Sequence, residues 1–112
     1  MEGQEYLEEL LLSSCHNLDS LTLKNCNGLK RVNMPNTKLS SCTVEGCENI
    51  TEIDISNTKH LRTLNLQGCP NLVKLNLSGV LSTILTDLDL TSSLKLEDLN
   101  ISSMPYINTI TF

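Results

Sequence analysis

The sequence predicts a mainly β solenoid of about five coils, with two strand-bearing sides and little or no helix. The first observation behind this prediction is an apolar pattern that repeats every ten or eleven residues along almost the whole chain. The second is that polar residues and turn residues fill the positions between the apolar ones. The third is the scarcity of aromatic residues, with one Phe, two Tyr and no Trp among 112 residues. Because aromatic side chains usually dominate a globular core, their scarcity favours a core built from thin, similar layers.

Each repeat unit opens with the pattern apolar-x-x-apolar-x-apolar, and ten units begin at residues 7, 18, 29, 39, 50, 61, 72, 85, 96 and 107. All thirty residues at unit positions 1, 4 and 6 are apolar if Cys42 is included. Positions 4 and 6 alternate with polar residues, which is the period of a strand with one buried face. Ser, Asn, Gly, Thr and Pro gather at positions 7 to 11, where we expect the turns.

The units alternate in kind, so one coil comprises two units. Units that begin at 7, 29, 50, 72 and 96 are type A, and those that begin at 18, 39, 61, 85 and 107 are type B. Position 9 distinguishes them: type B has Cys26, Cys47, Cys69 and Ser93, and type A has Cys15, Thr37, Thr58, Val80 and Met104. A coil therefore has 21 or 22 residues, lengthened to 24 by Leu81, Ser82 and Thr83. Since no coil can bury its leucines alone, stability must come from stacking.

The unit pattern L-x-x-L-x-L-x-x-C/N resembles the strand motif of leucine-rich-repeat proteins. The pair ITEIDISNTKH and LRTLNLQGCPN, residues 50–71, is similar to the short repeats of bacterial surface proteins, including internalin-like proteins and repeat proteins of gut bacteria. The resemblance covers residues 7–112. It implies a curved solenoid whose strand-lined concave face binds protein partners, at the cell surface or outside the cell.

Charge narrows the class of partner. The net charge of -5 argues against nucleic acid, which requires a basic patch, and against an anionic membrane surface. No apolar run approaches the roughly 20 residues that span a bilayer. The first residues, 1–5, lack the basic and apolar regions of a signal peptide.

The cysteine spacing indicates buried thiols. Cys26, Cys47 and Cys69 fall at one position of successive type B units, and we expect them to form an inward column. A zinc site requires about four ligands that converge on one ion, whereas a column spaced by the strand separation does not converge. Cys42 stands at an inward leucine position and is predicted to belong to the core.

No pattern indicates catalysis, a cofactor or a metal. Motifs such as G-x-S-x-G and H-E-x-x-H are absent from the sequence. His16 and His60 fall at corners two coils apart, and the carboxylate pairs, such as Asp87 with Asp89, fall on outward strand positions without a pocket. Three glycosylation sequons, at Asn49, Asn76 and Asn100, follow from the repeat itself.

We therefore expect a protein-interaction module of the adhesion or host-interaction type, with a structural spacer or scaffold segment as the alternative. Position 5 of each unit forms an outward column that can act as a hydrogen-bonded ladder or as a binding surface. If a partner exists, the type B strands are closest to the concave strand of the family. The predicted partner-binding residues are Lys24, Glu45, Arg62, Asn65, Gln67, Asp87 and Asp89.

The ends of the chain look uncapped. Only six residues precede the first unit, and the last unit stops at Phe112. Solenoids need terminal caps because an uncovered coil exposes its leucines and strand edges. Residues 1–112 are therefore predicted to be a single domain cut from a longer repeat array, or one whose ends are covered by a partner or another copy. In isolation the chain is expected to associate end to end and so to bury Ile107, Ile110 and Phe112. The alternative is that Phe112 folds over the core.

Overall fold

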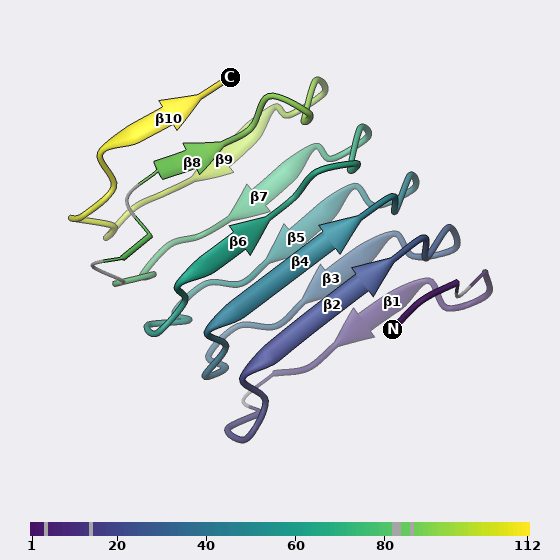
Figure 1. Ribbon diagram of the computed structural model, residues 1–112, viewed down its shortest axis with the longest axis horizontal. Coiled ribbons are helices and arrows are strands. Elements are labelled where there is room, and N and C mark those ends of the chain that lie inside the picture. Colours follow the sequence, from purple (N-terminus) through teal and green to yellow (C-terminus); the bar gives the residue numbers. More distant parts are fainter. Residues whose placement is uncertain (4, 14, 82–83, 86) are drawn as a thin grey trace.

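The chain forms a stack of short parallel strands wound into a solenoid (Figure 1). The computed structural model describes residues 1–3, 5–13, 15–81, 84–85 and 87–112. Within these residues there are ten strands and no helix, which confirms the predicted fold class. The strands are β1 (Glu9–Leu11), β2 (Ser20–Lys24), β3 (Arg31–Asn33), β4 (Ser41–Glu45), β5 (Glu52–Asp54), β6 (Thr63–Asn65), β7 (Lys74–Asn76), β8 (Asp87–Asp89), β9 (Asp98–Asn100) and β10 (Thr109–Thr111).

The strands divide between two sides in the same order in which the two kinds of unit alternate in the sequence. All type A strands join one five-stranded sheet in the order β1-β3-β5-β7-β9, which we call the odd sheet. The type B strands lie on the opposite side, the even side, as a three-stranded sheet β2-β4-β6 and a two-stranded sheet β8-β10. The register pairs equal unit positions, so that Val32 lies beside Ile53 and Ile53 beside Leu75.

The core fills the space between the two sides. Most side chains at positions 4 and 6 of the central units are almost fully buried, as Leu23, Val44 and Ile53 illustrate. Full burial of one such side chain contributes about 1.5–3 kcal/mol. Because neighbouring coils supply the walls on both sides, the terminal units are less protected: Leu7, Leu10, Ile107 and Ile110 are only half-buried.

At position 8 of most units the chain turns in the left-handed backbone region. Asn25, Asn36 and Asn57 have φ angles of 53°, 61° and 57°, and Gly46 and Gly79 have φ angles of 60° and 74°. Asn and Gly tolerate this region better than other residues. Gly79 has a second reason to be glycine, since a Cβ there would collide with the Asn57 side chain of the preceding coil.

The predicted cysteine column is confirmed. Cys26, Cys47 and Cys69 are completely buried free thiols, and so is Cys42 in the core. The Sγ of Cys47 lies 3.4 Å from the carbonyl oxygen of Glu45, a weak hydrogen bond to an acceptor that the Asn25 amide also uses at 3.0 Å. Burial raises the pKa of Cys42 and of Cys69 to about 12.

The two ends of the stack differ from each other. Residues 1–3 run beside β2, where the Lys24 amide donates to the Met1 carbonyl and the Gly3 amide donates to the Lys24 carbonyl, each at 2.9 Å. These residues therefore cover part of the β2 edge, although six residues looked too few to cover a coil. Phe112 is 81% exposed, so the alternative in which its ring closes the core is wrong. The part of the chain that the structure describes leaves most of the ring uncovered.

Among the described residues, no helix is long and apolar enough to cross a membrane.

Candidate functional site

The structure places the predicted partner-binding residues on the even side, but not as one surface. Lys24 on β2 and Glu45 on β4 form an ion pair at 3.7 Å. Arg62 directly precedes β6, and Asn65 is the last residue of that strand. The Oδ1 of Asn65 accepts a hydrogen bond from the backbone amide of Gln67 at 3.0 Å. The prediction that these residues bind a partner stays a prediction.

Asp87 and Asp89 stand apart from the other five predicted residues. They lie on β8, which pairs with β10, and within the described part of the chain no ladder joins β8 to β6. The long unit, residues 72–84, separates the two strands in sequence. Asp89 is fully exposed, and hydrogen bonds from Thr91 hold the pKa of its carboxyl below the usual range.

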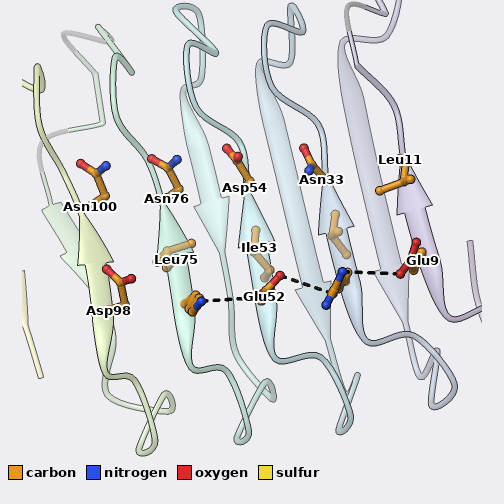
Figure 2. Close-up of a pocket in the computed structure, with 13 residues that line it drawn as sticks. Glu9, Leu11, Asn33, Glu52, Ile53, Asp54, Leu75, Asn76, Asp98 and Asn100 are labelled. Carbon is orange, nitrogen blue, oxygen red and sulfur yellow. Dashed lines mark ion pairs between the residues drawn. The ribbon is translucent and has the colours of Figure 1, made fainter.

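A groove of about 460 Å³ lies on the other side, over the odd sheet (Figure 2). Each of the five strands contributes outward side chains to it. Since β1, β3, β5, β7 and β9 are paired in register, these side chains form two parallel rows across the strands. We call the position-3 row the charged row and the position-5 row the amide row.

The charged row alternates in sign across the sheet: Glu9, Arg31, Glu52, Lys74 and Asp98. Arg31 contacts Glu9 at 3.7 Å and Glu52 at 3.4 Å, and Lys74 contacts Glu52 at 3.7 Å. The dashed lines of Figure 2 follow this chain of ion pairs to Glu9. The side chains are 39–58% exposed, so each pair contributes only about 0–1 kcal/mol. These ion pairs therefore hold the side chains of the charged row in position but contribute little to the stability of the fold.

The amide row consists of Leu11, Asn33, Asp54, Asn76 and Asn100. Three of its oxygens cap the turn after their own strand: Asp54 Oδ1 accepts the Ser56 amide at 2.9 Å, and Asn76 and Asn100 accept the Ser78 and Ser102 amides at 3.0 Å. This is the local side-chain-to-backbone bond typical of Asn and Asp. The column expected as a possible ladder thus makes its hydrogen bonds within each unit.

The turn-capping hydrogen bonds use only the side-chain oxygens of Asn76 and Asn100, which line the groove and lie on one level with Asp54 in Figure 2. Each amide can donate two hydrogen bonds to a bound molecule. The groove therefore offers hydrogen-bond donors on one level and alternating charges on the other, a combination suited to a polar, extended partner.

Other chemistry finds little support among the described residues. They contain no group of three or more His, Cys, Asp and Glu that could hold a metal ion. His16 and His60 are exposed corner residues, as expected.

Sequence reasoning did not predict the charged row. The signal was present: once the type A units are aligned, position 3 reads Glu, Arg, Glu, Lys, Asp. This alternation of charge predicts a row of ion pairs only if every second unit is known to pair in one sheet, because that pairing places opposite charges side by side.

No curated protein and no solved structure matches the chain. A family model described as "At1g61320/AtMIF1, LRR domain" matches residues 2–112. This match does not confirm the resemblance to internalin-like proteins. It agrees with the paired short coils and the alternating strands, and the chain belongs to this leucine-rich-repeat family.

Proposed function

We propose that the chain is a non-catalytic protein-binding module that takes its partner in the groove over the odd sheet. Leucine-rich-repeat domains generally mediate protein–protein interaction and are typically non-enzymatic. The observation that carries the proposal is the groove itself, because all five odd strands contribute outward polar side chains to one continuous hollow. An adhesion or host-interaction role is a finer form of the same proposal.

The even side is the second candidate surface, as the predicted set from Lys24 to Asp89 requires. Its support is the L-x-L-x-x-C pattern of the type B strands. Against it stands the division of that side into two separate sheets, β2-β4-β6 and β8-β10. The odd sheet is unbroken over five strands, and we therefore favour it.

The test begins with the selection of peptides that bind the intact chain from a random peptide library. The affinity of the selected peptides is then measured for two matched variants of the chain. Asn76→Tyr fills the groove, and Asn65→Tyr places the same ring at the same unit position on the even side. Each substitution removes one Asx cap, from the Ser78 amide or the Gln67 amide, so their structural costs are similar.

We expect the selected peptides to lose binding to Asn76→Tyr and to keep binding to Asn65→Tyr. The opposite ranking would move the site to the even side. A library that yields no binder would favour a structural spacer, and binders that both variants retain would place the site outside both tested surfaces.

A further inference from the structure

We infer that the partner presents a cationic segment to the groove, with Lys or Arg side chains that reach Asp54 and Asp98. This inference rests on the proposed function and adds the chemical class of the partner. It depends on which charges of the groove are already neutralised by neighbouring side chains.

Both cations of the groove are held by carboxylates. Arg31 lies between Glu9 and Glu52, and Lys74 contacts Glu52 from the other side. An anionic partner would have to compete with these ion pairs for Arg31 and Lys74. Since Glu52 is shared by two cations, its own charge is also compensated.

Two carboxylates of the groove are not compensated in this way. Among the described residues, Asp54 and Asp98 have no ion-pair partner within 4.0 Å. Asp54 uses Oδ1 to accept the Ser56 amide, and its second oxygen stays available. The groove has four carboxylates and two cations among its lining residues, a net charge of minus two. A cationic segment complements this charge, whereas an anionic segment opposes it.

The separation of the two carboxylates suggests the form of the segment. Asp54 lies on β5 and Asp98 on β9, with β7 between them. At about 4.8 Å per strand and about 3.3 Å per residue along a strand, their backbones lie roughly 12 Å apart across the sheet. Two basic side chains four positions apart on an extended chain span about 13 Å. An extended segment with this spacing can therefore contact both carboxylates while its backbone meets the amides of Asn76 and Asn100.

The test uses a short synthetic peptide with two arginines four positions apart and a matched peptide with glutamine in their place. Their dissociation constants are measured by titration calorimetry on the wild-type chain, on D54N/D98N and on D87N/D89N. Asp87 and Asp89 occupy the same unit positions on the even side as Asp98 and Asp54 do on the odd sheet, so the two double variants change charge equally. Asparagine keeps the oxygen that caps the turn, as Asn76 and Asn100 demonstrate in neighbouring coils.

We expect the arginine peptide to bind the wild-type chain more tightly than the glutamine peptide, and its affinity to fall with added salt. D54N/D98N should weaken its binding about fivefold, and D87N/D89N should leave it unchanged. Urea unfolding of both variants checks that the fold is kept, and D98N alone, at the exposed edge strand, provides a milder variant.

Three results would overturn the inference: equal affinity of the two peptides, equal loss in the two double variants, or no binding of the arginine peptide. None of them touches the proposed function, because Asn76→Tyr tests occupation of the groove by peptides of any charge. Conversely, arginine-peptide binding that survives Asn76→Tyr and is lost in D87N/D89N would place a cation-binding surface on the even side and contradict both.

Discussion

The interior thiols illustrate how position within a repeat determines the reactivity of a residue. Cys42 and Cys69 have a pKa of about 12 because burial disfavours the thiolate, and burial also raises the pKa of Cys47. Cys15 occupies position 9 of its unit, as Cys47 and Cys69 do, but it lies in the first coil of the described stack and is only half-buried. The reactive form of a cysteine is the thiolate, so accessibility and pKa act in the same direction here.

We therefore expect a thiol reagent at neutral pH to label Cys15 rapidly and the four buried cysteines slowly. Mass spectrometry of peptides taken over time would give the rate at each site. In denaturant all five should react at similar rates, which serves as the control. Labelling of Cys42 or Cys69 as fast as Cys15 in native buffer would show that the core opens far more often than its burial suggests.

At the scale of a structural element, the corner after each strand repeats its geometry while its side chains vary. Thr37, Thr58 and Val80 occupy position 9 of three successive type A units, and all three are buried. The Thr37 hydroxyl lies 3.5 Å from the Met34 carbonyl oxygen, whereas the Thr58 hydroxyl is buried with no hydrogen-bond partner within the described structure. A buried hydroxyl without a partner costs free energy relative to an apolar group of the same shape.

Thr58→Val should therefore raise the free energy of unfolding by about 1 kcal/mol, since the methyl group replaces an unsatisfied hydroxyl. Val80 shows that the next coil accepts valine at this position. Urea unfolding measures the change, with Thr37→Val as the control that loses a hydrogen bond and should not gain stability. A loss of stability in Thr58→Val as large as in Thr37→Val would mean that the Thr58 hydroxyl has a partner in solution, such as a water molecule.

The element scale also shows which parts of the site the sequence predicts. The alternation of apolar and polar residues determines which residues face inward, because only one face of each strand is buried. The outward positions of Glu52 and Asn65 follow from this alternation. The same alternation holds on both sides of the solenoid, so it does not determine which sheet is hollow. Which sheet carries the groove depends on the three-dimensional arrangement of the whole stack, which the alternation does not contain. The odd-sheet groove was for this reason not predicted.

At the scale of the whole molecule, the stack predicted from thirty apolar positions is the stack observed, with ten strands and pairing between equal unit positions. The two ends of the stack are the places where the repeat loses its neighbours. Phe112 shows the limit of the pattern, since it occupies an inward position and yet is 81% exposed. An apolar residue is buried only if a following coil or a partner supplies the other wall.

End-to-end association of the 112-residue chain, proposed from its apolar ends, meets an electrostatic obstacle in the odd sheet. A second copy that continued this sheet in register would place its Glu9 directly beside Asp98 of the first. Like charges at directly opposite positions destabilise strand pairing, by about 0.2–1 kcal/mol. Residues 1–3 also lie along the edge of β2 that the even side would need for stacking. We therefore expect the wild-type chain to associate only weakly.

Glu9→Lys should strengthen this association, because the repulsion with Asp98 becomes an attraction. The expected change is about a tenfold lower dissociation constant at low salt, measured by sedimentation equilibrium over a range of concentrations. Added salt should reduce the difference, since the two groups lie at the solvent-exposed ends of the sheet. Glu48→Lys makes the same change of charge at an exposed corner and should leave the dissociation constant unchanged. If Glu9→Lys and the wild-type chain associate equally, the copies do not meet through the edges of the odd sheet, and the apolar ends must associate in another register or not at all.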